Sequence, residues 1–146
     1  MKAILLLLLF ILTYSASSQW LKAKGKVIVN SEDEEVLLRG LGPGGWMVME
    51  GYMMKTAGFA GTQHEIRSEL IKLMGVEKTD LFFDQWLANH FTQRDVDSLA
   101  AWGFNSIRLP MHYNLFTLPI EDEPVSGNHT WLGKGFEMVD SLLSWC

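Results

Sequence analysis

Two short apolar runs, each leading into residues suited to binding a polar ligand, constrain the fold of this 146-residue chain. They are residues 39–50, with the sequence RGLGPGGWMVME, and residues 103–113, with the sequence GFNSIRLPMHY. Each run predicts a β-strand, and helical patterns lie between them. Consecutive parallel strands joined by a right-handed crossover lie side by side, with both carboxyl ends at the same edge of the sheet. We therefore expect the polar residues that end the two runs to lie at one edge.

Helical periodicity predicts four helices along the chain. Two of them begin with a capping box, in which Thr62 is followed by Glu65 and Thr92 is followed by Asp95. In such a box the hydroxyl and the carboxylate each accept a hydrogen bond from a backbone amide that the helix leaves without a partner. The helices are expected at about residues 62–75, 80–90, 92–103 and 134–145. Where a capping residue or a terminating glycine occurs, the range includes it.

The order of the expected elements predicts an α/β fold with a parallel sheet. The β-rich runs 25–29 and 36–38, separated by the polar residues 30–35, predict a preceding β-hairpin. Ligand-binding residues at the carboxyl ends of parallel strands are typical of a (β/α)8 TIM barrel, which takes about 250 residues to close. We expect residues 19–146 to form the opening β/α units of such a barrel, which is incomplete in this chain.

The N-terminus has the pattern of a secretory signal peptide. Lys2 is followed by the apolar run 3–12 and by small and polar residues up to Ser18. The run is shorter than the roughly 20 residues of a membrane-spanning helix, so we expect cleavage after Ser18 and no stable membrane anchor. The sequence thus predicts a secreted protein, extracellular or periplasmic, with residues 1–18 removed.

Composition and residue spacing bear on nucleic-acid binding, disulfide formation, metal binding and glycosylation. The net charge is −5 and no basic run occurs, which argues against a nucleic-acid partner. Cys146 is the single cysteine, so no intramolecular disulfide can form. The four histidines show no metal-ligand spacing, and we expect neither a metal nor another cofactor. The sequence Asn128-His129-Thr130 matches the acceptor pattern for N-glycosylation.

The two runs resemble the first- and second-strand motifs of glycoside hydrolase family 5, which includes cellulases and exo-β-1,3-glucanases. The first motif corresponds to residues 39–41 and 44–50, and the second to residues 103–110. This chain differs from many members at Gly42, where they carry asparagine, and at Pro43, where they carry leucine or a similar residue. The resemblance implies a secreted O-glycosyl hydrolase with a β-glucan or a related saccharide as its substrate.

Arg108 is the strongest candidate for a supporting catalytic role. An arginine in an apolar strand is expected to be buried and paired, and on the residues alone a structural ion pair and a site role are equally good interpretations. The resemblance implies that Arg108 lies in the active-site floor and orients the nucleophilic carboxylate. Glu50, which in isolation is best read as a solvated acid, is implied to accept hydrogen bonds from sugar hydroxyls.

Three further residues are candidates for binding substrate. Trp46 is a possible stacking platform for a sugar ring, although a tryptophan in such a run is more often part of the core. His112 and Tyr113 follow the second strand, and His112 points to the same side as Arg108 if the strand stays extended. We expect both to line the site, with a role as hydrogen-bonded wall residues as the alternative.

The resemblance implies that the two catalytic carboxyls of the family are missing from this sequence. A retaining glycosidase places two carboxyls about 5–5.5 Å apart, and the resemblance implies two glutamates, the first of them preceded by asparagine. No Asn-Glu pair occurs in this chain, so we expect the chain alone to be inactive and at best marginally folded. Alternative interpretations are a non-catalytic secreted carbohydrate-binding protein, which would more often be a β-sandwich, and a secreted structural or interaction protein.

Overall fold

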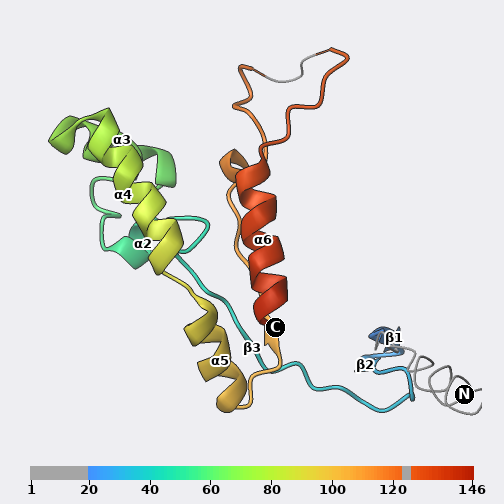
Figure 1. Ribbon diagram of the computed structural model, residues 1–146. Coiled ribbons are helices and arrows are strands. Elements are labelled where there is room, and N and C mark those ends of the chain that lie inside the picture. The colour runs from blue at the N-terminus through green and yellow to red at the C-terminus, as the bar shows by residue number, and fades with distance from the viewer. Residues whose placement is uncertain (1–19, 123–125) are drawn as a thin grey trace, which may run out of the picture. The chain divides into compact units, whose positions relative to one another are not determined.

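The computed structural model describes residues 20–122 and 126–146 and divides the chain into two compact units, Met1–Leu37 and Leu38–Cys146. The predicted signal peptide, residues 1–18, lies outside the described residues. Figure 1 labels most of the elements of the two units, which we describe separately.

The first unit contains a tight antiparallel hairpin that was not predicted. Strands β1 (Lys22–Lys24) and β2 (Val27–Val29) pair around Gly25, whose φ of 63° lies in the left-handed region that glycine adopts without strain. The predicted reversal at residues 30–35 is also present, because the Asn30 N–H donates to the Glu34 carbonyl over 2.9 Å and the Val36 N–H donates to the Ile28 carbonyl over 2.8 Å, with an antiparallel bridge between Val29 and Glu35. Residues 36–38 form no strand, so the predicted second strand is reduced to this short contact with β2.

The second unit confirms the predicted parallel pair. Strand β3 (Gly40–Leu41) pairs in parallel with β4 (Ser106–Ile107), and further along the same two runs Met47 and Met111 form a parallel bridge. The start of the pair is fixed by Asn105, whose side-chain Oδ1 accepts a hydrogen bond of 2.7 Å from the Arg39 backbone N–H. Two polypeptide segments more than sixty residues apart are thereby held in one register.

Helices make up most of the second unit. Both predicted capping boxes are present, at Thr62 and at Thr92. The helix predicted at about 80–90 begins earlier, because Gly75, with φ 83°, ends one helix and directly precedes the next. Two short helices were not predicted, namely α2 and the 3-10 helix η1. The bounds are α2 Gly51–Met54, α3 Gln63–Met74, α4 Val76–Asn89, α5 Gln93–Ala101, η1 Tyr113–Leu115 and α6 Gly133–Trp145.

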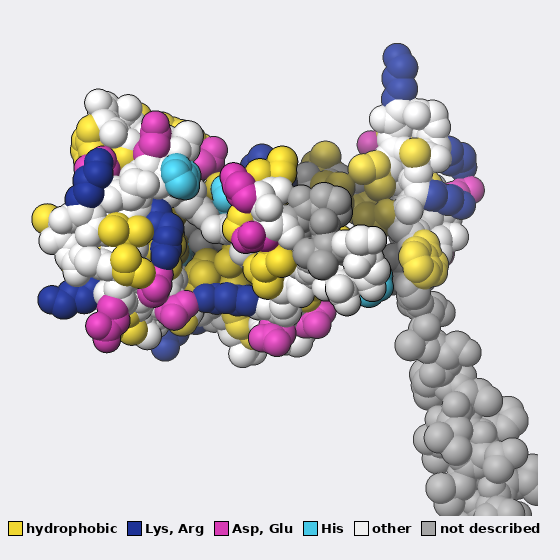
Figure 2. All heavy atoms as spheres, turned by 90° about the horizontal axis from the view of Figure 1, so that it is seen from above, with side chains coloured by type: hydrophobic (Ala, Val, Ile, Leu, Met, Phe, Trp, Pro, Cys, Tyr) yellow, Lys and Arg dark blue, Asp and Glu magenta, His cyan; other side chains and the backbone are white. Residues whose placement is uncertain are grey.

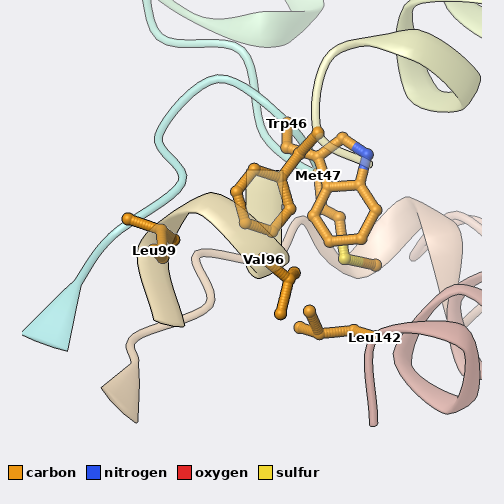
Figure 3. Close-up of a cluster of buried hydrophobic side chains, with 6 residues drawn as sticks. Trp46, Met47, Val96, Leu99 and Leu142 are labelled. Carbon is orange, nitrogen blue, oxygen red and sulfur yellow. The ribbon is translucent and has the colours of Figure 1, made fainter. Parts of the chain in front are cut away.

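Two clusters of buried side chains hold the second unit together. In the larger, Trp46 and Met47 from the first run pack against α5 and α6, and the smaller is formed by Met49, Ala60 and Ile66. Figure 3 shows side chains of the larger cluster converging from the first run and both helices. Its buried members are Trp46, Met47, Phe91, Val96, Leu99 and Leu142. The segment that follows β3 therefore carries core residues and candidate site residues in succession.

The described residues contain two sheets of two strands each and no closed barrel. An α/β arrangement with a parallel strand pair is thus observed, and the barrel stays a prediction.

Many large apolar side chains are exposed, and Figure 2 shows hydrophobic patches between charged side chains. No helix within residues 20–122 or 126–146 is both long and apolar enough to cross a membrane.

Candidate functional site

The backbone joins the two sequence runs directly where the candidate residues lie. The Arg108 N–H donates to the Leu41 carbonyl over 3.0 Å, and the His112 N–H donates to the Met47 carbonyl over 3.1 Å. The residues that end each run therefore follow adjacent parallel segments. This arrangement places Arg108, His112 and Tyr113 after β4, and Glu50 after the matching stretch of the first run.

Arg108 is exposed, which corrects the expectation that it is buried. The sheet formed by β3 and β4 has two strands among the described residues, so no further strand there covers the guanidinium. A Cβ atom added at Gly42 would lie 3.5 Å from Arg108 Nη1, so this glycine borders the guanidinium. Within the described part of the chain Arg108 makes no ion pair, and its charge is available to a carboxylate brought to this edge.

Glu50 is half-buried and occupies the N-cap position of α2 in an extended conformation. Its carbonyl accepts hydrogen bonds of 3.0 Å from the backbone N–H groups of Met53 and Met54. Its side chain makes no capping hydrogen bond. The backbone of Glu50 is therefore fixed by the short helix, while its carboxylate is not used for capping.

His112 and Tyr113 form a stacked pair of rings, with centroids 4.7 Å apart and planes inclined by 29°. His112 Nδ1 accepts a hydrogen bond of 3.3 Å from the Asn114 N–H, which fixes the imidazole at the start of η1. Because Nδ1 is the acceptor, a neutral ring carries its proton on Nε2. Tyr113 is 57% exposed, so one edge of the pair faces outward.

The same two rings border both a polar cleft and an apolar depression. The cleft, of about 770 Å³, lies between α3 and α4 on one side and η1 and the start of α6 on the other. The depression is lined by His112 and Tyr113 together with Met111, Phe116, Trp131 and Phe136. An apolar surface with polar groups beside it is the combination that sugar rings require, because a pyranose has an apolar face and hydroxyl groups at its rim. Glu50 and Arg108 line neither hollow.

Gln63 is a cleft residue that the sequence pattern did not identify. Its side-chain Oε1 accepts a hydrogen bond of 2.7 Å from the Met49 N–H, and its Nε2 donates to Asn114 Oδ1 over 3.5 Å. It thus connects the end of the first run to the residues that follow the second. Its position as the first helical residue after the Thr62 cap was the available signal, although that position alone did not indicate which backbone it would contact.

Trp46 belongs to the core and not to an open surface. It is 2% exposed, its indole N–H donates to the Leu87 carbonyl over 2.8 Å, and its ring lies 5.3 Å from that of Phe91. This burial corrects the expectation of a stacking platform and supports the alternative of core packing. Trp46 also contributes to the lining of the polar cleft, but its side chain is not exposed there as an open surface.

Two ion pairs, also not predicted, lie along the cleft. Arg67 of α3 pairs with Asp80 of α4, and Lys134 of α6 pairs with Asp84 of α4. The second pair connects helices on opposite sides of the cleft. Because each cation has an acidic partner, the cleft is polar without a strong excess of either charge. Within the described ranges no group of three or more histidine, cysteine, aspartate or glutamate side chains could hold a metal ion.

Comparison with known proteins identifies relatives over most of the chain. A β-xylosidase from Phanerodontia chrysosporium is 36% identical over 127 residues, which are 87% of this chain and 25% of that protein. A probable glucan 1,3-β-glucosidase A from Aspergillus clavatus is 26% identical over 94% of this chain and 31% of its own length. A glucan endo-1,6-β-glucosidase B from Emericella nidulans is 29% identical over 72% of this chain and 24% of its own length. No protein-family model matches the chain.

These comparisons confirm the resemblance to glycoside hydrolases. The relatives named above are all glycosidases, and the similarity extends over most of this chain. The chain spans only about a quarter to a third of the length of these relatives.

Proposed function

Given that the chain is homologous to glycoside hydrolases over most of its length, we propose that it is part of a secreted retaining enzyme that cleaves β-glucosidic bonds in polysaccharides. The proposed architecture is a TIM barrel of family 5 type, in which this chain supplies the opening β/α units. The chain's share of its relatives' length supports this proposal, because a barrel domain takes about 250 residues and is therefore longer than this chain.

The observation that supports the proposal is the parallel pairing of the two runs. Parallel pairing of β3 with β4 and of Met47 with Met111 brings the polar residues of both runs to one edge. In TIM-barrel enzymes the active site is built at the carboxyl ends of the strands. We therefore propose that substrate binds at the edge that carries Arg108, His112 and Tyr113.

Each residue has a distinct proposed role. The Arg108 guanidinium holds the nucleophilic carboxylate ionised and oriented, since a fixed positive charge nearby favours the charged form of an acid. Glu50 accepts hydrogen bonds from sugar hydroxyls, for which an acceptor-only carboxylate is well suited. Tyr113 offers its exposed ring to the apolar face of a sugar, and His112 supports that ring and can donate from Nε2.

The acid/base and the nucleophile are proposed to come from a part of the enzyme outside residues 1–146. Substrate contacts alone bind the ground state and leave the barrier to hydrolysis nearly unchanged. This division of roles also distinguishes the proposal from a non-catalytic carbohydrate-binding protein. Such modules are mostly β-sandwiches, whereas helices dominate the described part of this chain.

The role of the Tyr113 ring is tested by native electrophoresis in gels that contain soluble β-1,3-glucan or β-1,4-glucan. We expect the glucan to retard the protein, Tyr113→Phe to keep the retardation, and Tyr113→Ala to weaken binding about five- to tenfold, which is the scale of one aromatic contact. Tyr52→Ala is the matched control, because Tyr52 is 69% exposed on α2 and lines neither hollow. Equal retardation of the Tyr113→Ala and Tyr52→Ala variants would contradict the assignment.

A further inference from the structure

A long loop between η1 and α6 carries the acceptor sequence Asn128-His129-Thr130. Figure 1 shows the chain leaving η1, running out as a loop and returning to the start of α6. The two ends of the loop are joined by an antiparallel bridge between Thr117 and Trp131 and by a 2.8 Å hydrogen bond from the Leu132 N–H to the Phe116 carbonyl. The loop thus has a closed base, and residues 126–130 lie beyond it.

Asn128 is accessible in this loop. Residues 126–129 are all exposed, and Gly127, with φ 79°, turns the chain immediately before the asparagine. A Cβ atom added at Gly127 would meet no other atom within 4 Å, so the space beside the turn is open. Within the described residues the Asn128 side chain makes no hydrogen bond, and its amide is therefore free to react.

From these observations we propose that Asn128 is an N-glycosylation site. The donor is a lipid-pyrophosphate-linked oligosaccharide of the kind that a eukaryotic secretory pathway supplies. The bond between C1 of the first sugar and the pyrophosphate oxygen breaks, and its electron pair leaves with the pyrophosphate. A bond forms between that C1 and the Asn128 side-chain nitrogen, and the proton lost from the amide is taken up by the leaving pyrophosphate.

The surroundings of Asn128 suit a bulky hydrated glycan. Asn128 itself lines neither the polar cleft nor the apolar depression. Trp131 follows three residues later and is 64% exposed, and Ile120 on the same loop is 78% exposed. A glycan on Asn128 therefore adds a hydrated group three residues before an exposed tryptophan, which is a solubilising arrangement. The proposal requires entry into the secretory pathway, which the N-terminal sequence predicts, and it does not depend on the proposed enzymatic role.

The test expresses the full chain in yeast from its own N-terminus, with an Asn-Gly-Thr acceptor appended after Cys146 to report entry into the secretory pathway. Total cell extract and medium are both analysed by gel mobility with and without peptide N-glycosidase. The peptide containing residue 128 is examined by mass spectrometry, since enzymatic deglycosylation converts a modified asparagine to aspartate. The variants are Asn128→Gln, Thr130→Ala and Thr130→Ser, the last of which retains a hydroxyl at the required position.

We expect the unaltered chain and Thr130→Ser to carry a glycan on Asn128 as well as on the tag, and Asn128→Gln and Thr130→Ala to carry the tag glycan alone. A chain glycosylated on the tag but with unmodified Asn128 would overturn the proposal. A chain modified at neither position would also overturn it, because its own N-terminus would then have failed to direct it into the pathway.

Discussion

The Gln63 side-chain Oε1 accepts a hydrogen bond of 2.7 Å from the backbone N–H of Met49, fourteen residues earlier. Met49 is 2% exposed, so this N–H has no access to water. The same side chain donates to Asn114, which directly follows the other run. The Gln63 side chain therefore provides an acceptor for the buried Met49 N–H next to Glu50. It also links the end of the first run to the segment that carries His112 and Tyr113.

Replacing Gln63 by alanine is expected to destabilise the second unit by about 1–3 kcal/mol, because the buried Met49 N–H loses its acceptor. Thermal or urea unfolding followed by circular dichroism measures this change. Gln85→Ala is the matched control, since Gln85 is exposed on α4 and, among residues 20–122 and 126–146, its side chain accepts only from Asn89. Equal stability of the two variants would show that the Met49 N–H finds another partner.

Stability is expected to fall in acid through the two capping boxes. Hydrogen bonds from the Thr62 backbone and the Gly61 backbone lower the pKa of Glu65 below its ordinary value of 4.5, and hydrogen bonds from the Thr92 side chain and backbone lower the pKa of Asp95 below 3.8. A carboxyl whose pKa is lowered by folding stabilises the folded state above its unfolded pKa. That contribution is lost as pH falls through the lowered, folded-state value.

The double variant Glu65→Gln and Asp95→Asn is therefore expected to lose less stability than the unaltered chain between about pH 7 and pH 3. Melting temperatures recorded across this range measure the difference. Asp140→Asn, on the exposed side of α6, is the control and should retain the original acid dependence. Parallel stability curves for the double variant and the unaltered chain would contradict the prediction.

Arg108→Ala, in the proposed full-length enzyme, is expected to reduce kcat far more than it raises KM. Loss of the charge raises the pKa of the nucleophile and loosens its orientation, which is a defect in the transition state and not in substrate binding alone. Steady-state kinetics on a β-glucan oligosaccharide separate the two parameters. Arg94→Ala, on the exposed surface of α5, is the control, and a near-normal kcat for Arg108→Ala would assign Arg108 a structural role.

The features of the fold that depend on local sequence could be predicted. Both capping boxes occur where Thr62 and Thr92 are followed at the third position by an acid, and the parallel pairing of the two runs follows from their order along the chain. The reversal predicted at residues 30–35 is present, whereas the additional hairpin at Gly25 was missed because two residues suffice for its turn. The predicted start of α4 is too late because the apolar pattern that indicates it begins several residues inside the helix.

The pairing of the two runs was predictable, but the side-chain contacts of the candidate residues were less so. The order of the two runs predicts parallel pairing, which extends as far as Met47 and Met111. The burial of Trp46 and the exposure of Arg108 depend on which segments pack over each side chain, and the sequence pattern carries no such information. The two contacts of Gln63 join segments that only the folded chain brings together.

The central claim is that this chain binds a β-glycan at the edge formed by its two runs but lacks the carboxyl pair that cleaves it. The most direct measurement follows sugar release from β-1,3- and β-1,4-glucans by the purified chain, with retention in glucan-containing gels recorded on the same sample. The account predicts retention without release above an empty-vector control. Release that exceeds this control and is abolished by Glu50→Gln would contradict it, because a carboxylate within the chain would then be catalytic.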